Sequence, residues 1–315
     1  MTNPIEAENL SRSFGDLVAV NGIDLTVEEG EVFGFLGPNG AGKSTAVRML
    51  TTLLKPTGGS ARVAGFDVTS EASMVRKKIG VALQDAAIDP LMTGNELLRL
   101  QAVLHGIPRH EGKQRCAELL ERVGLTAAGD KRVGTYSGGM RRRLDLALSL
   151  VHQPKVLFLD EPTTGLDPTS RVALWEEVRT LNKEIGTTVF LTTQYLEEAD
   201  QLAQRIAIID NGMIVREGTP TKLKSDVGAP TLRVDVVESD FEIAKQVMTK
   251  LGEERPARKG RIAIGLDGGT RAITAVLKTL EDQNIEVQHV ELDEPSLDDV
   301  FADATGRRLD GGANT

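Results

Sequence analysis

The first part of the chain carries short apolar runs broken by turn residues, a pattern typical of β-strands. Residues 17–20 and 23–27 form two such runs, and the Asn21-Gly22 pair between them predicts a hairpin. A compact apolar run over 31–36 predicts a buried strand. Two further strand candidates are 61–63 and 79–83. The pattern therefore predicts an antiparallel β subdomain beside a buried strand.

From residue 93 to residue 150 the apolar positions recur at steps of three and four, which predicts helices. Strand-like runs then return at 156–159, 188–191 and 205–209, with helical patterns at 170–185 and 195–204 between them. Alternating strands and helices predict a parallel sheet with helices on its faces. The Asp210-Asn211-Gly212 segment predicts a hairpin into a last strand over 213–217.

The stretch over 225–230 contains glycine and proline and predicts a linker, after which a second small domain begins. Its predicted strands are 232–237, 261–266 and 285–292, and its predicted helices are 241–252, 269–283 and 296–305. This order predicts an α+β domain of ferredoxin-like type with a terminal helix. The expected limits are 1–224 for the first domain, 231–307 for the second and 308–315 for a flexible tail.

The composition is that of an ordinary globular protein, with 40% hydrophobic and 26% charged residues among 315. The formal net charge of −9 argues against a nucleic-acid partner, because phosphate contacts need clustered Lys and Arg. No apolar stretch approaches the ~20 residues of a membrane span, and we expect no secretory signal. The single cysteine, Cys116, is expected to be a buried thiol in a reducing, cytosolic compartment. Any membrane role must therefore come through a partner.

A glycine-rich segment follows the buried strand and matches the phosphate-loop pattern G-x-x-x-x-G-K-[ST]. It consists of Gly37, Pro38, Asn39, Gly40, Ala41, Gly42, Lys43, Ser44 and Thr45. Its glycines let backbone N–H groups point at phosphate oxygens, and the helix that begins near Lys43 adds the positive end of its dipole. Lys43 is expected to reach the β- and γ-phosphates of ATP, and the Ser44 hydroxyl to bind Mg²⁺.

The apolar run over 156–159 ends in two carboxylates, Asp160 and Glu161. A buried strand can end in aspartate only if that charge is satisfied, and in a phosphate-loop enzyme the Mg²⁺ shell satisfies it. Glu161 follows at the strand end, where it could accept a proton from an attacking water. The sequence therefore predicts Asp160 as a metal-side carboxylate and Glu161 as the general base.

Two further motifs carry a resemblance to a known family. Residues 136–140 (Tyr-Ser-Gly-Gly-Met) are similar to the signature of ATP-binding-cassette proteins, and 165–168 (Gly-Leu-Asp-Pro) resemble the D-loop of that family. Gln84 matches its Q-loop. The order of these motifs is the family's own, and the resemblance covers about residues 4–222. It implies a phosphate-loop NTPase of ABC type, with a RecA-like parallel-sheet core, an antiparallel β subdomain and a helical subdomain.

The signature supplies a second anion site, because Ser137, Gly138 and Gly139 offer a hydroxyl and unobstructed N–H groups at a helix N-terminus. In the family the signature of one subunit closes on the phosphate loop of the other. The resemblance therefore implies that a second copy of this chain completes each ATP site in a head-to-tail dimer.

The resemblance also assigns roles to four other residues. Phe14 stands at the position where an aromatic ring stacks on adenine, although a single Phe in a strand is ordinarily a core residue. Gln84 belongs beside Mg²⁺, and Asp167 beside the nucleotide. Gln194 replaces the usual switch histidine; an amide can donate a hydrogen bond to the γ-phosphate but cannot take up a proton near neutral pH. Proton abstraction is therefore expected of Glu161, and positioning of Gln194.

The signature, Gln194 and the final motif over 297–301 (Leu-Asp-Asp-Val-Phe) together resemble the daunorubicin/doxorubicin-resistance type of ATP-binding subunit. This resemblance implies an ATPase bound peripherally to the cytoplasmic side of the cell membrane. It would power efflux of hydrophobic drugs or lipids through a separate membrane permease. The segment 297–301 could instead be a helix that closes the core of its own domain.

Two other functions compete with export. A non-transport cassette ATPase acting on DNA or ribosomes is disfavoured, because neither a long coiled coil nor a second cassette is present and the chain is acidic. A module that holds ATP without hydrolysing it would be expected to lack Lys43 or Glu161, and both are present. Gln194 is the feature that keeps this second alternative open.

Overall fold

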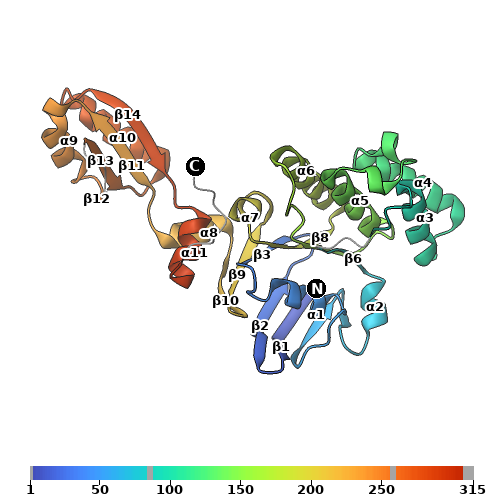
Figure 1. The fold of residues 1–315 in the computed structure, drawn as a ribbon. Coiled ribbons are helices and arrows are strands. Elements are labelled where there is room, and N and C mark those ends of the chain that lie inside the picture. The colour runs from blue at the N-terminus through green and yellow to red at the C-terminus, as the bar shows by residue number, and fades with distance from the viewer. Residues whose placement is uncertain (1–2, 84–87, 256–259, 308–315) are drawn as a thin grey trace. The chain divides into compact units, whose positions relative to one another are not determined.

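The computed structural model describes residues 3–83, 88–255 and 260–307, which form two compact units (Figure 1). The boundary between the units falls between Pro220 and Thr221. Within the described ranges, no helix has the length and apolar character needed to cross a membrane.

A six-stranded sheet forms the centre of the first unit, in the order β10-β9-β3-β8-β7-β6. Its strands are β3 (Val32–Leu36), β6 (Ile79–Ala82), β7 (Val156–Asp160), β8 (Thr188–Thr193), β9 (Arg205–Asp210) and β10 (Met213–Gly218). All neighbours pair in parallel except β9 and β10. Asn211 (φ 48°) and Gly212 (φ 78°) form the turn between these two strands. The hairpin predicted at this point is confirmed.

Both faces of this sheet are buried, which explains its nearly continuous apolar strands. Phe33, Phe158 and Phe190 belong to a core shared with α1 (Lys43–Leu50) and the antiparallel sheet. Leu157 and Leu191, on the alternate positions, belong to a core shared with α6 (Pro168–Ile185) and α7 (Leu196–Leu202). The sheet is therefore a rigid platform for the loops at its strand ends.

The antiparallel sheet contains β1 (Ile5–Phe14), β2 (Leu17–Val27), β4 (Gly58–Val63) and β5 (Phe66–Asp67), in the order β2-β1-β4-β5. A short helix, α2 (Ala72–Arg76), follows it. The hairpin predicted at Asn21-Gly22 is wrong, because β2 runs straight through this pair. The pair forms a bulge opposite Ser11, whose hydroxyl accepts a hydrogen bond from the Gly22 N–H at 3.0 Å. Gly22 does have a positive φ (64°), as it would in a tight turn, but within this bulge.

The helical subdomain lies between β6 and β7 in sequence, as predicted (Figure 1). It consists of α3 (Gly94–Leu104), α4 (Arg109–Arg122), the 3₁₀ turns Thr126–Ala128 and Val133–Thr135, and α5 (Gly138–Leu150). Thr93 and Glu96 form a capping box at the start of α3. Cys116 is buried in the core of this subdomain, as expected.

The second unit has the predicted ferredoxin-like topology, with an antiparallel sheet in the order β12-β13-β11-β14. Its elements are α8 (Pro220–Val227), β11 (Thr231–Val236), the 3₁₀ turn Glu238–Asp240, α9 (Phe241–Met248), β12 (Glu253–Glu254), β13 (Arg261–Gly265), α10 (Gly269–Asp282), β14 (Val287–Asp293) and α11 (Leu297–Thr305). The two-residue strand β12 was missed, since both its residues are exposed glutamates. The linker predicted over 225–230 is shorter than expected, because α8 continues to Val227.

Candidate functional site

Three of the predicted motifs meet at one edge of the parallel sheet. β8 lies between β3 and β7, and the carboxyl ends of all three strands point the same way. The phosphate loop follows β3, Gln194 follows β8, and Asp160 ends β7. Ligands of open α/β sheets bind outside the carboxyl ends of the strands, so this edge is the candidate nucleotide site.

At two positions of the phosphate loop there is room only for glycine. A Cβ atom at Gly37 would lie 2.3 Å from the Ile209 carbonyl oxygen, and one at Gly42 would lie 2.5 Å from that of Ala19. Gly42 has a φ of 108° and is the N-cap of α1. The loop thus packs directly on β9 and β2, and its curvature leads into a helix N-terminus suited to phosphate.

Lys43 is buried at the start of α1, and its ammonium group has three partners. Nζ donates to the carbonyl oxygens of Gly37 at 2.7 Å and Pro38 at 3.0 Å. It also forms an ion pair with Oε1 of Glu161 at 3.1 Å. Burial lowers the pKa of Lys43, and the charge of Glu161 offsets part of that effect. The predicted phosphate-binding cation and the predicted base are therefore direct neighbours.

Asp160 presents its carboxylate to two hydroxyl groups. Its Oδ1 accepts hydrogen bonds from Thr192 and, at 3.3 Å, from Ser44 Oγ. A carboxylate and a hydroxyl are hard oxygen ligands that suit Mg²⁺, which protein sites usually bind through few side chains together with substrate phosphates. No group of three or more His, Cys, Asp or Glu that could hold a metal occurs in the described part of the chain. The oxygen ligands at this edge, from Ser44 and Asp160, therefore fit Mg²⁺.

Glu161 has a left-handed backbone, with a φ of 48°, and is only 6% exposed. Its N–H group donates to the backbone and hydroxyl oxygens of Thr192, each at 3.1 Å. Its Oε2 lies 3.4 Å from the hydroxyl of Thr164. Left-handed backbone at a residue other than glycine is costly and is concentrated at functional sites. The structure thus fixes this carboxylate in a turn that the sequence did not predict.

The signature forms the start of α5 and contacts the D-loop helix. Ser137 is the N-cap of α5, and its hydroxyl accepts from the Met140 N–H at 3.2 Å. A Cβ atom at Gly139 would lie 2.6 Å from Ser170 Oγ. Asp167 caps α6 by accepting from the N–H and hydroxyl of the same Ser170, which lowers the pKa of its carboxyl. Ser170 therefore contacts both the signature and the D-loop. Lys43, by contrast, contacts the phosphate loop and Glu161.

The remaining predicted residues lie at the margins of the described site. Phe14 ends β1 and is 46% exposed, so it is not a core residue, and the Arg12 guanidinium lies 4.6 Å from its ring centroid. Gln194 is half-buried immediately after β8, whose last residue, Thr193, accepts from the Gly37 N–H at 3.2 Å. Gln84 lies outside the described residues.

Two residues of the site were not predicted. Thr192, in β8, bonds both the Asp160 carboxylate and the Glu161 N–H group. Its signal in the sequence is a pair of threonines at the end of an apolar, fully buried strand. Arg142, in α5, bonds the backbone on both sides of Glu161. Its signal is weaker, because it is the middle residue of three consecutive arginines.

Asp145 lies one turn after Arg142 in α5 and accepts from its Nη1 at 3.1 Å. Burial raises the pKa of Asp145 to about 6, although Arg142 opposes that rise. Because the pKa of this carboxyl is higher in the folded than in the unfolded protein, protonation of Asp145 favours the folded state. This stabilisation is complete at a pH below the unfolded pKa and is lost as the pH rises through about 6.

The Asp145→Asn variant tests this contribution. Asparagine resembles the neutral form, so the variant should gain stability relative to wild type by about 2 kcal/mol between pH 4 and pH 7. Urea unfolding followed by the fluorescence of Trp175, the single tryptophan, measures the difference. A difference that is constant with pH would contradict the raised pKa.

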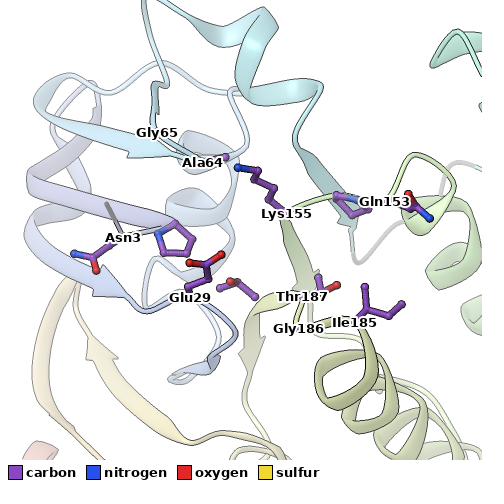
Figure 2. Close-up of a pocket in the computed structure, with 12 residues that line it drawn as sticks. Asn3, Glu29, Ala64, Gly65, Gln153, Lys155, Ile185, Gly186 and Thr187 are labelled. Atoms are coloured by element: carbon purple, nitrogen blue, oxygen red, sulfur yellow. The ribbon is translucent and has the colours of Figure 1, made fainter. Parts of the chain in front are cut away.

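A separate cavity of about 480 Å³ lies at the opposite edge of the sheet (Figure 2). Lys155 and Thr188 line it at the amino ends of β7 and β8, together with Asn3, Glu29 and Gly186. The phosphate loop, Asp160 and Glu161 lie at the carboxyl edge instead. The cavity is therefore distinct from the candidate site.

The comparisons with known proteins agree with this geometry. The family model described as ABC transporter matches residues 20–164, and that of the DrrA1-3-like C-terminal domain of ATP-binding proteins matches 218–305. A solved dimer of the ATP-binding cassette MJ0796, in a post-hydrolysis state with ADP and Pi, is 26% identical with a TM-score of 0.63. That alignment covers 68% of this chain and 98% of the solved chain. The fold and the site define an ATP-binding-cassette ATPase.

Two relatives match almost the whole chain. The daunorubicin resistance ATP-binding protein DrrA2 of Streptomyces coeruleorubidus is 46% identical over 310 residues, covering 97% of this chain and 96% of the relative. The daunorubicin/doxorubicin resistance ATP-binding protein DrrA of Streptomyces peucetius is 47% identical over 313 residues, covering 98% and 94%. The chain belongs to the ABC transporter family, in the branch of the daunorubicin/doxorubicin-resistance ATP-binding proteins. The predicted family, fold class and role as the ATPase motor of an exporter are confirmed.

Proposed function

We propose that two copies of this chain bind two ATP molecules between them, head to tail, and drive a separate membrane permease that exports a hydrophobic drug. Each ATP would lie between the phosphate loop of one protomer and the signature of its partner. The dimer would sit at the cytoplasmic side of the cell membrane. Residues 1–224 would form the motor domain, and 231–307 an accessory domain.

The observation that carries the proposal is that one chain has two separate helix N-termini of the kind that can bind phosphate. The phosphate loop leads into α1 beside Glu161, while Ser137, Gly138 and Gly139 start α5 beside α6. Both are helix N-termini with close-packed glycines, which suit phosphate. One copy of each device per chain is what a shared site requires. The dimeric state of the solved cassette with ADP and Pi supports this arrangement.

The residues at the carboxyl edge have distinct roles in this proposal. The N–H groups of Gly40, Ala41 and Gly42 and the Lys43 ammonium would hold the phosphates. Ser44 and Asp160 would hold Mg²⁺, which would neutralise charge on the β- and γ-phosphate oxygens. Thr192 orients the Asp160 carboxylate through its hydroxyl. Phe14 would stack on adenine, and Asp167 would bring the D-loop to the nucleotide.

Glu161 would take the proton from the attacking water. Its carboxylate is an ion-pair partner of Lys43, so phosphate oxygens that approach Lys43 would compete with Glu161 for the same cation. Displaced from Lys43, the carboxylate could accept a proton near the γ-phosphate. Gln194, at the end of β8, would donate a hydrogen bond there. ATP binding would in this way free the base.

Mixing variant chains tests the head-to-tail arrangement. We expect Lys43→Met and Ser137→Arg chains to be inactive separately, because each homodimer lacks a required group at both sites. A mixed dimer of the two has one site with Lys43 and Ser137 both intact, so it should have about half of the wild-type turnover if the sites work independently. An equal, randomly paired mixture, in which about half of the dimers are mixed, should therefore recover about a quarter of the wild-type turnover. ATP hydrolysis by the mixture, compared with each variant alone, measures this.

The matched control is a chain that carries both substitutions, mixed with wild type. In a head-to-tail dimer each site of this mixed pair has one defect, so the pair should be inactive. If each chain completed its own ATP site, the results would be reversed: the two single variants would stay inactive together, and the wild-type chain would work beside the double variant. That reversal would refute the shared site.

Export itself is tested with the permease present. Inside-out membrane vesicles that contain both subunits should accumulate doxorubicin when ATP is added, and vesicles with Glu161→Gln should not. Loss of permease co-purification on deletion of 225–315 would assign docking to the second unit. Equal uptake by both kinds of vesicle would refute ATP-driven export of this drug.

A further inference from the structure

Arg142 is a largely buried cation in α5, 9% exposed, whose guanidinium reaches three backbone carbonyl groups. Nε donates to Pro162 at 2.8 Å, Nη2 to Asp160 at 3.0 Å and Nη1 to Leu83 at 2.6 Å. Nη1 also donates to the Asp145 carboxylate at 3.1 Å. Arginine is the side chain whose rigid fork has enough donors for all four contacts.

Two of these carbonyls, those of Asp160 and Pro162, belong to the residues on either side of Glu161. The intervening residue has the left-handed φ of 48°, a conformation that persists only where its surroundings hold it. Thr192 holds the same turn from β8, through the Glu161 N–H. The turn is therefore held from two sides, by a strand of the parallel sheet and by a helix of the helical subdomain.

The helix that carries Arg142 begins at Ser137, the signature residue proposed to contact the partner's nucleotide. α5 thus connects the two proposed ATP sites. Its N-cap, Ser137, would contact the nucleotide of the partner, whereas Arg142 contacts the turn that contains Glu161, the proposed base of the chain's own site. The two neighbouring arginines do not have this reach: Arg141 donates to the Tyr136 carbonyl at 3.2 Å and Arg143 to that of Val123 at 2.9 Å.

We propose that Arg142 is a positioning residue for hydrolysis, which holds the Glu161 turn in its active geometry and attaches it to α5. This inference rests on the proposed function, because it takes Glu161 as the base. Its chemistry is restricted to orientation: Arg142 contacts main-chain oxygens of the turn and transfers no proton.

The test compares Arg142→Met with Arg143→Met in the full-length chain. Removing the Arg142 hydrogen bonds should lower kcat for ATP by about 100-fold, since displacement of a catalytic group by about 1 Å has effects of that size. ATP affinity, measured with a fluorescent analogue, should change by less than about threefold, because the phosphate loop is untouched. Arg143→Met should stay within about twofold of wild type for both quantities.

Two further variants separate positioning from simple loss of stability. Arg142→Met combined with Asp145→Asn removes the carboxylate that would lose its cation, and kcat should still be about 100-fold low. Arg142→Lys keeps the charge with fewer donors, and its kcat should lie between those of wild type and Arg142→Met. Hydrogen exchange in a peptide that covers 158–164 should accelerate in the methionine variants, while exchange over 43–50 stays unchanged.

The outcomes distinguish this inference from the proposal on which it rests. If Glu161→Gln is inactive while Arg142→Met with Asp145→Asn turns over ATP at the wild-type rate, only the role of Arg142 is refuted. A parallel loss of ATP affinity and kcat, or faster exchange throughout the chain, would also refute it, since Arg142 would then be merely structural. If Glu161→Gln hydrolyses ATP normally, the base assignment fails, and the inference fails with it.

Discussion

Replacing Glu161 by glutamine is expected to lower ATP turnover by about 10³-fold while ATP still binds. Glutamine keeps the size of the side chain and can occupy the same left-handed turn, but it cannot accept the proton of the attacking water. The carboxylate pairs with Lys43, so the variant also removes a competitor of the phosphates for that cation. ATP affinity should therefore be equal to wild type or higher. Turnover in solution and equilibrium binding of an ATP analogue measure the two effects.

Gln194→Ala is the matched comparison at the same sheet edge. We expect it to slow turnover without stopping it, because the amide only positions groups near the γ-phosphate. A Glu161→Gln chain that hydrolyses ATP near the wild-type rate would contradict the assigned base. A Gln194→Ala chain as inactive as Glu161→Gln would transfer an essential role to the amide.

Lys43→Met is expected to weaken ATP binding strongly and to reduce turnover by about 10³-fold or more. The ammonium is buried and is surrounded by the carbonyls of Gly37 and Pro38 and by Glu161, so methionine leaves each of these acceptors without its cation. Breaking a buried ion pair in this way costs about 3–5 kcal/mol, and the variant should also unfold more easily. Equilibrium binding, turnover and urea unfolding measure the three consequences.

A second substitution separates binding from folding in this experiment. In the Lys43→Met, Glu161→Gln double variant no carboxylate remains opposite the missing cation, so most of the lost stability should return. ATP binding should stay weak, because the ammonium is still absent. Recovery of ATP binding in the double variant would show that Lys43 acts on the nucleotide only by neutralising Glu161.

Local chemistry determined which elements of the fold could be predicted. The phosphate loop needs glycines at fixed spacing, and the Asn211-Gly212 hairpin needs two residues with positive φ, so both are visible in the sequence. Asn21-Gly22 has the same composition but forms a bulge, because Ser11 and the Gly212 carbonyl bond the N–H groups of this pair. Those partners are distant in sequence. Tertiary contacts therefore decided between a turn and a bulge.

The candidate site likewise has a part that local sequence predicts and a part that depends on tertiary contacts. The phosphate loop, Asp160 and Glu161 could be predicted because the binding of phosphate and Mg²⁺ needs these residue types. The signature could be predicted from the order of the motifs along the chain. The left-handed turn at Glu161 and its attachment to Arg142 could not be predicted, since both depend on where α5 packs against the ends of β6 and β7. Three consecutive arginines look alike in sequence, and only the fold shows that the middle one reaches this turn.

The positive φ of Glu161 is a local cost in stability that the ion pair with Lys43 offsets. Asparagine and glycine adopt left-handed backbone more readily than glutamate, by about 1 kcal/mol, but either would leave the Lys43 ammonium buried without this carboxylate, at a cost of about 3–5 kcal/mol. Selection for heat resistance alone would therefore retain glutamate at position 161 as long as Lys43 is present. Variants that replace both residues would relieve the strained backbone but would lose the phosphate-binding ammonium and the proposed base, so a screen for thermostability has to include ATP hydrolysis.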